Sequence, residues 1–371
     1  GPMSTPRLLR ERELGGRGRG GASLGFTPGC VRQLQLAGPL ERSDREEMGY
    51  LSHAGCVNCV TWNEEDDGRT LVSGSDDRTI KVWDTRDLHN VRLRATLLTC
   101  HTNNIFDVKF VPHAGASQLV SCGLDGQLRL HFLGGRGAEA LLLGENAEYG
   151  DMIRSFTFWD GESVGAGPST VLTAQEDGNV TLVDLRAGVH HNRIIYENTS
   201  SNGAFRTSVN VLAVAPHSVA PNCVAIGATG PNISLIDMRM MVVHGMRKPQ
   251  PVRYYRPSFF DDESVDSFSL SVSSLVYSKG DNELLANYQD SMLFTFNTRC
   301  QDQVVPHKAV YGGHVNHQTF LKQAAYFGPR DEYVMCGSDS GHIWIYDRHT
   351  RRVANLLRAD RHIVNGCMPH P

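Results

Sequence analysis

The strongest constraint on the fold is a pattern that recurs six times along the chain. Each copy has a short apolar strand-like run, a turn, and a second strand-like run, which together read as a β-hairpin. The copies close at Asp84, Phe132, Asp184, Asp237, Asn297 and Asp347, so their spacing lies between 48 and 60 residues. A repeat of about this length is typical of a β-propeller, in which each repeat forms one blade.

A further strand-like run precedes each copy, so every unit has room for the four strands of a blade. These runs are CVNCVTW, IFDVKFV, IRSFTFW, VNVLAVA, VSSLVYS and LKQAAYF. Blades must stack on one another because no single sheet can bury both of its faces. We therefore expect an all-β propeller over residues 30–371.

Two pieces outside the six repeats bear on how the ring closes. CVRQLQL (Cys30 to Leu36) precedes the first repeat and reads as a strand that closes the ring from the N-terminal side. RHIVNGCMPHP (Arg361 to Pro371) reads as the first strand of another blade. Six repeats and these two pieces predict a seven-bladed ring whose last blade is incomplete in this chain.

The first 29 residues differ from the repeats. Gly1 and Pro2, ahead of Met3, read as the scar of an expression tag. TPRLLREREL (Thr5 to Leu14) has an N-cap candidate, Pro at the first helical position and good helix formers, so it predicts a short helix. The Gly-rich stretch from Gly15 to Gly25 predicts a flexible linker, and we interpret its two Arg as linker residues rather than an RNA contact.

Composition excludes several classes of function. A net charge of -4 gives no reason to expect a nucleic-acid partner, and no apolar run is long enough to span a bilayer. The nine Cys are dispersed, which indicates reduced thiols in a nuclear or cytoplasmic protein. Cys56 and Cys59 are close, but no second pair follows at zinc-ligand spacing, so we interpret them as packing residues. The motifs of hydrolases and nucleotide-binding enzymes are absent, so we expect neither enzymatic activity nor a metal or cofactor.

SHAGCV (Ser52 to Val57), followed by SGSDDRTIKVWD (Ser73 to Asp84), resembles a WD repeat. The resemblance implies a hydrogen-bonded tetrad inside blade one, made of His53, Ser73, Asp77 and Trp83.

Other blades keep parts of this tetrad. Blade two keeps its first three members, as His101, Ser121 and Asp125, but has His131 in place of the Trp. We expect the tetrads of blades four and six to be broken, because Gly230 and Ser340 stand where the Asp belongs.

An Arg follows the closing residue of four blades by two positions. These are Arg86, Arg186, Arg239 and Arg299. An exposed Arg next to an Asp contributes little to stability, so stability alone is a weak reason to repeat the pair. Because the blades have similar geometry, we expect the guanidinium groups to share one rim of the disc, where planar donors suit a protein partner.

This arrangement resembles the WD-x-Arg signature of the DCAF family, the substrate receptors of cullin-4 RING ubiquitin ligases. Ser273 to Asn297, Tyr326 to Asp347 and the C-terminal segment are most similar to the branch that contains the eighth member. The resemblance implies docking on the adaptor, damaged-DNA-binding protein one, through Arg186 and Arg239 first and Arg86 second. It also implies that the helix with Leu8, Leu9 and Leu14 inserts into the adaptor.

Two alternatives stay open. The chain could be a generic WD-repeat scaffold in another complex, such as one in chromatin or RNA processing, and in that case it has no use for the leading helix. The acidic loop FFDDESVD (Phe259 to Asp266) is either an idle connection or a binding element, since its two Phe stand beside charges. The sequence does not identify the protein that such a receptor would present for ubiquitination.

Overall fold

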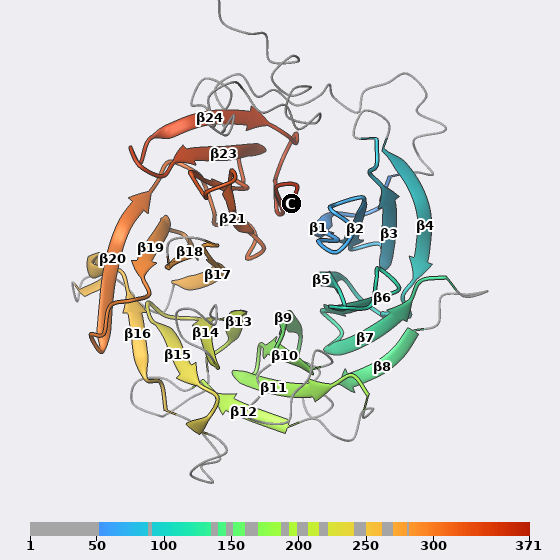
Figure 1. Ribbon diagram of the computed structural model, residues 1–371, viewed down its shortest axis with the longest axis horizontal. Helices are drawn as coiled ribbons and strands as arrows, with labels where there is room; N and C mark the ends of the chain where they lie inside the picture. The colour runs from blue at the N-terminus through green and yellow to red at the C-terminus, as the bar shows by residue number, and fades with distance from the viewer. Residues whose placement is uncertain are drawn as a thin grey trace, which may run out of the picture.

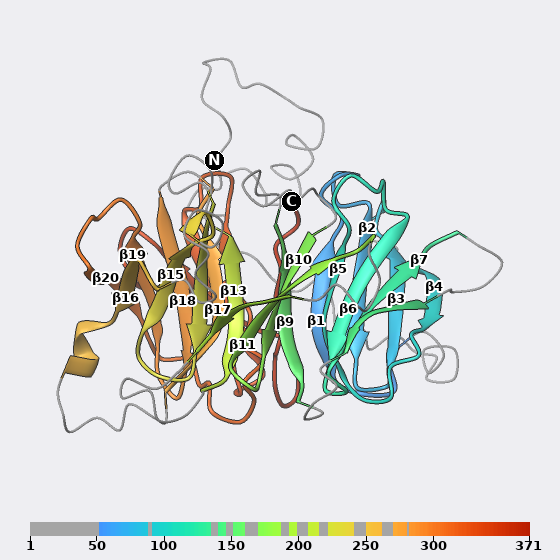
Figure 2. The ribbon, with the colours of Figure 1, turned by 90° about the horizontal axis from the view of Figure 1, so that it is seen from below.

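The computed structural model (Figure 1) describes residues 52–87, 91–134, 140–145, 151–159, 170–186, 193–198, 207–214, 222–240, 250–261, 270–279 and 282–371. Its strands follow one another around a ring, in groups of four consecutive antiparallel strands ordered from the centre outward. The described part of the chain forms six such blades, which confirms the predicted all-β propeller. Figure 2 shows the blades standing side by side as a disc.

The strands of blades one to three lie close to the predicted runs. Blade one has β1 (Val57–Trp62), β2 (Thr70–Ser75), β3 (Thr79–Asp84) and β4 (Arg92–Leu98); blade two has β5 (Ile105–Phe110), β6 (Gln118–Gly123), β7 (Gln127–Phe132) and β8 (Ala140–Glu145); blade three has β9 (Ile153–Phe158), β10 (Thr170–Gln175), β11 (Asn179–Asp184) and β12 (Arg193–Glu197).

Blades four to six follow the same order, with one short 3-10 helix after β16. Blade four has β13 (Val209–Val214), β14 (Cys223–Ala228), β15 (Ile233–Asp237), β16 (Arg253–Arg256) and then η3 (Ser258–Asp261); blade five has β17 (Ser271–Tyr277), β18 (Glu283–Gln289), β19 (Leu293–Asn297) and β20 (Val304–Tyr311); blade six has β21 (Ala324–Phe327), β22 (Tyr333–Cys336), β23 (His342–Asp347) and β24 (Val353–Arg358).

The turn between the second and third strands explains why Asp and Gly recur there. In blades two and three, Gly126 and Gly178 adopt positive φ, a conformation that costs Gly least. The Asp just before each Gly accepts the backbone N–H two residues further on, as Asp125 does from Gln127 and Asp177 from Asn179. This local bond closes the turn and starts the third strand.

The core lies between blades rather than inside them. Each of the five larger apolar clusters combines residues of two neighbouring sheets, for example Val72 and Ile80 of blade one with Val108 of blade two. Side chains on the inner strands add hydrogen bonds: Asn58 Nδ2 donates to Ile105 O at 2.8 Å and Thr61 Oγ1 to Val108 O at 2.7 Å. Since both contacts advance in the same direction, β1 and β5 run parallel, and equivalent strands end on the same face.

One pairing between blades was not predicted. The outermost strand of blade four, β16, pairs in parallel with the outermost strand of blade five, β20, through Tyr254↔Val304 and Tyr255↔Val305. The two blades therefore share one eight-stranded sheet. A bridge of this kind covers two edges that would otherwise expose unpaired backbone groups.

Residues 361–371 contain no strand, so the prediction of a strand over Arg361 to Pro371 is wrong. They run between β21 and β1, close to the centre of the ring (Figure 1). Their backbone bonds connect them to loops: Val364 N donates to Ser338 O, and Asn365 O accepts from Gln323 N. On the other side Trp62 Nε1 donates to Met368 O at 3.2 Å, so this segment joins blade six to blade one.

The predicted N-terminal helix, the Gly-rich linker and the strand over Cys30 to Leu36 lie outside the described residues, as do Leu8, Leu9 and Leu14. None of the helices in the part of the chain that the structure describes is long and apolar enough to cross a membrane.

Candidate docking surface

The Arg at the end of β3 is held by the Asp that closes the strand. Arg86 Nε donates to Asp84 Oδ1 at 2.9 Å, and Arg86 Nη2 donates to Asp84 Oδ2. Asp84 Oδ1 also accepts the backbone N–H of Arg86 at 3.1 Å. The guanidinium is therefore oriented by a two-pronged contact, the geometry in which Arg and a carboxylate interact best.

Blades three and four repeat this arrangement. Arg186 Nε and Nη2 lie 3.0 and 2.8 Å from the carboxylate oxygens of Asp184. The corresponding distances from Arg239 to Asp237 are 3.0 and 2.6 Å. All three pairs follow the third strand of a blade, so they lie on one face of the disc. We call Arg86, Arg186 and Arg239 with their Asp partners the Arg face.

The guanidinium groups of the Arg face are accessible as well as oriented. The side chains of Arg86, Arg186 and Arg239 are 72%, 63% and 53% exposed. The hydrogen bond from Arg86 lowers the pKa of Asp84 to about 2, so this carboxylate stays ionised at neutral pH. Because each Asp takes donors from Nε and Nη2, the Nη1 side of each guanidinium can face a partner.

The Arg that follow the third strands of blades five and six are arranged differently. In blade five the side chain of Asn297 accepts the backbone N–H of Arg299, but an amide cannot form the ion pair of the Arg face. In blade six the Arg follows Asp347 directly, and Arg348 turns instead to Glu283 of blade five. The expected rim is thus most regular in blades one, three and four.

The four predicted tetrad residues of blade one meet in a single chain of hydrogen bonds. Trp83 Nε1 donates to Ser73 Oγ at 2.9 Å, Ser73 Oγ lies 2.8 Å from His53 Nε2, and His53 Nδ1 lies 2.8 Å from Asp77 Oδ2. Burial opposes the charge on Asp77, yet hydrogen bonds led by those from Thr79 lower its pKa to about 2. Burial lowers the pKa of His53, which favours the neutral ring.

Blade two forms the same chain with a different last member. His101 contacts Asp125 at 2.9 Å and Ser121 at 2.8 Å, and His131 Nε2 lies 2.7 Å from Ser121 Oγ, where Trp83 Nε1 lies in blade one. In blade six the corresponding His314 contacts Tyr346 and Asn287, so the expected break in that tetrad is present.

The other residues singled out in the sequence occupy separate places. Cys56 is exposed whereas Cys59 is buried, and burial raises the pKa of the Cys59 thiol. Among the described residues no group of three His, Cys, Asp or Glu side chains is placed to hold a metal ion. In the acidic loop Phe260 is buried, while Phe259 is 55% exposed and stacks on His307 at 5.1 Å; residues 262–266 lie outside the described ranges.

Comparison with known proteins places two of these blades in a named family. The family described as WD domain, G-beta repeat matches residues 46–84 and 92–131, which contain the tetrad residues of blades one and two. The chain is a WD-repeat β-propeller. The family match itself covers blades one and two, the blades that contain the tetrads described above.

Longer similarities extend beyond the two matched repeats. The human WD and tetratricopeptide repeats protein 1 is 35% identical over 218 residues, which cover 58% of this chain and 29% of that protein. The human DDB1- and CUL4-associated factor 6 is 25% identical over 303 residues, or 80% of this chain and 31% of that protein. Protein ALTERED SEED GERMINATION 2 of Arabidopsis thaliana is 27% identical over 290 residues, 72% of this chain and 37% of that protein. The chain spans about a third of the length of these curated relatives.

Sequence reasoning missed a second polar group on the same side of the disc, formed by Glu283, Lys308 and Arg348. The available signal was the offset of one residue in YDRH, where Arg348 follows Asp347 directly. An offset Arg leaves the strand in a different direction and reaches the neighbouring blade instead of its own Asp.

Proposed function

We propose that the chain is a non-enzymatic substrate receptor of a cullin-4 RING ubiquitin ligase, active in the nucleus, the cytoplasm or both. The main support for the proposal is that three blades present an oriented, exposed Arg–Asp pair on the same face of the propeller. The similarity to a protein whose name associates it with DDB1 and CUL4 supports it. The family-like segments favour the branch that contains the eighth member of the DCAF family.

The Arg face is suited to hold an adaptor for a physical reason. A guanidinium fixed by its own Asp loses little conformational freedom on binding, so its free donors reach carbonyl or carboxylate groups of a partner at low entropic cost. In the proposal Arg186 and Arg239 make the main contacts with damaged-DNA-binding protein one, and Arg86 adds a third. The helix with Leu8, Leu9 and Leu14 supplies a separate apolar contact.

The target protein would bind on the opposite face. The turns around Asp77, Asp125, Asp177 and Asp290 lie there, because they connect the second strand of each blade to the third, whereas the Arg face lies beyond the third. A receptor of this kind positions the target while partner subunits transfer ubiquitin.

Binding to purified damaged-DNA-binding protein one tests the proposal. We expect the intact chain to bind, and both a chain that starts at Gly25 and the Arg186→Ala/Arg239→Ala variant to lose at least about tenfold in affinity. Arg193→Ala, an exposed substitution on the outermost strand β12, serves as the matched control and should bind like the intact chain. Biolayer interferometry measures all four proteins.

The alternative is a generic WD-repeat scaffold, which is favoured by the higher identity to a relative whose name records only its repeats. If the folded, intact chain shows no binding to the adaptor, the receptor proposal fails and the scaffold becomes the better description. If only the Gly25 chain loses affinity, docking depends on the leading segment and the Arg face is not part of it.

A further inference from the structure

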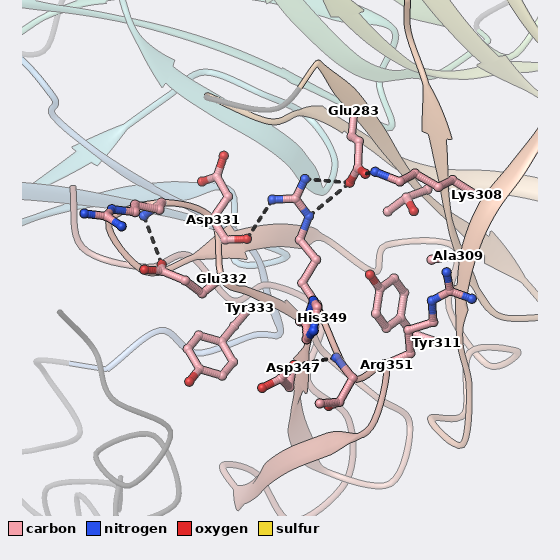
Figure 3. Close-up of a pocket in the computed structure, with 14 residues that line it drawn as sticks. Glu283, Lys308, Ala309, Tyr311, Asp331, Glu332, Tyr333, Asp347, His349 and Arg351 are labelled. Atoms are coloured by element: carbon pink, nitrogen blue, oxygen red, sulfur yellow. Dashed lines mark hydrogen bonds and ion pairs between the residues drawn. The ribbon is translucent and has the colours of Figure 1, made fainter. Parts of the chain in front are cut away.

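A cavity of about 680 Å³ opens between blades five and six. Figure 3 shows its lining, which includes Glu283 at the start of β18, Lys308 and Tyr311 on β20, and residues after β23. Arg348 and Arg351 follow the third strand of blade six. The residues of the Arg face also follow the third strands of their blades. The cavity therefore opens on the same side of the disc as the Arg face.

The buried carboxylate of Glu283 forms ion pairs with two cations, Arg348 and Lys308, in this cavity. The Glu283 side chain is 4% exposed; its Oε2 accepts from Arg348 Nε at 3.0 Å and Nη2 at 2.7 Å, and its Oε1 contacts Lys308 Nζ. Arg348 also donates from Nη1 to Asp331 O at 3.0 Å. Arg348 is thereby fixed, whereas Lys308 keeps 56% of its side chain exposed toward the opening.

A third cation, Arg351, completes what we call the Lys308 lobe, made of Glu283, Thr295, Lys308, Tyr311, Arg348 and Arg351. The guanidinium of Arg351 pairs with no carboxylate among the residues that the structure describes. The lobe thus carries three cations and one carboxylate, a surplus of two positive charges.

The acidic residues of the cavity do not cancel this surplus locally. Figure 3 shows Asp331 and Glu332 on the far side of Arg348 from Lys308. Asp331 accepts the backbone N–H of Lys279, Glu332 that of Arg330, and Asp347 that of Thr350. These backbone donors orient the three carboxylates without neutralising them, and Asp331 and Glu332 form an acidic part of the cavity that is separate from Lys308 (Figure 3).

Two hydroxyl groups lie next to each other at the base of the Lys308 lobe. Tyr311 and Thr295 are each 1% exposed, and the Tyr311 hydroxyl interacts with that of Thr295. Figure 3 shows the Tyr311 hydroxyl pointing toward the side of the cavity where Lys308 and Glu283 lie. Two hydroxyls that face each other use only one of their two O–H donors, so one O–H remains available to an acceptor at the base of the lobe.

We propose that the Lys308 lobe binds a phosphate monoester, as carried by a phosphorylated serine or threonine side chain of a partner protein. Such a group has a charge of about -1.5 to -2 at neutral pH and three strong acceptor oxygens. It matches the surplus of two positive charges better than a carboxylate, which carries only one negative charge. Lys308, Arg351 and the remaining hydroxyl donor are the groups that bind the phosphate; Arg348 stays paired with Glu283. The proposal goes beyond adaptor docking and does not depend on it.

Calorimetric titration of the full chain with O-phospho-L-serine, inorganic phosphate and acetate tests the proposal. Phosphoserine should bind most tightly, inorganic phosphate more weakly and acetate weakest. The Lys308→Ala/Arg351→Ala variant should lose at least about tenfold in affinity for phosphoserine, since it removes both accessible cations. Arg352→Ala, an exposed neighbour that does not line the cavity, is the matched control and should bind unchanged.

Tyr311→Phe provides a second test in case the Lys308→Ala/Arg351→Ala variant does not fold. Among the described residues the Tyr311 hydroxyl interacts only with the Thr295 hydroxyl, so the variant should lower the melting temperature only slightly while losing phosphoserine affinity severalfold. The proposal is overturned by no saturable binding of phosphoserine to the folded chain, by equal affinity of the wild type and the double variant, or by acetate binding as tightly as phosphoserine.

Discussion

Lys322→Met is expected to lower the free energy of unfolding by about 3–5 kcal/mol, because it leaves a buried carboxylate without its cation. Lys322 Nζ lies 2.8 Å from Asp339 Oδ1, and the two side chains are 0% and 1% exposed. The ammonium also donates to Asn365 Oδ1 at 3.1 Å, so the same variant loosens the segment that joins blade six to blade one.

The loss should spread beyond blade six. Lys322 lies near the end of the connection from β20 to β21, and this connection also contains Phe320. The Phe320 ring packs edge-on against Phe106 of blade two at 5.3 Å, and the guanidinium of Arg154 of blade three lies 4.5 Å above it. Because this connection contacts three blades, it couples their stabilities. Loss of the Lys322–Asp339 pair should therefore lower the free energy of unfolding more than a substitution on an outer strand.

Urea denaturation at pH 7.5 measures the effect, and two further variants interpret it. The Lys322→Met/Asp339→Asn double variant should recover part of the loss, because a neutral amide still accepts the backbone N–H groups of His317 and Gln318. Lys308→Met is the control on a mostly exposed lysine and should cost far less. A loss below about 1 kcal/mol for Lys322→Met would show that the buried pair does not anchor the connection.

The repeats could be read from the sequence because their signals are local. A turn such as LDGQ, with Asp125 before Gly126, is specified by residues two apart, and six copies at similar spacing leave one simple architecture. The tetrads follow from the same copies, since an inner loop and a hairpin of one blade meet wherever the blade forms.

What the sequence did not predict depends on neighbours far along the chain. Residues 361–371 have a strand-like composition, but a strand needs a partner backbone, and this segment meets loops instead. Asp339 and Lys322 belong to no motif, and their pairing appears only when two loops of blade six fold together. The cavity of the Lys308 lobe forms between two blades, so no single repeat contains its pattern.

The substitution of His for Trp in blade two has a consequence for stability in acid. His101 Nδ1–H donates to Asp125, so Ser121 donates to His101 Nε2, and His131 must donate its own Nε2–H to Ser121. In blade one the indole N–H of Trp83 donates the equivalent hydrogen bond, and an indole does not take up a proton in this pH range. His131 is 0% exposed and its Nδ1 is buried without a described partner, so adding a proton there is unfavourable.

Burial, followed by repulsion from His101 and Arg129, lowers the pKa of His131 to about 3. An unfolded His has a pKa of about 6.5, so the unfolded chain binds the proton more tightly and folding is destabilised as the pH falls below that value. The stability contribution is complete above about pH 6.5 and is lost progressively as the pH falls toward 3. At pH 5 the loss from this residue alone is about 2 kcal/mol.

His131→Gln should remove this part of the pH dependence, because the amide can donate to Ser121 Oγ without taking up a proton. We expect the difference in unfolding free energy between pH 7.5 and pH 5 to be about 2 kcal/mol smaller in the variant than in the wild type. Urea denaturation at both values measures it, and the other histidines cancel since both proteins contain them. An equal difference in the two proteins would mean that His131 accepts a proton in the folded blade as readily as in the unfolded chain. In that case the tetrad of blade two would tolerate a charged ring, and the acid sensitivity of the propeller would have to arise from its other buried histidines, such as His314, whose pKa burial lowers to about 4.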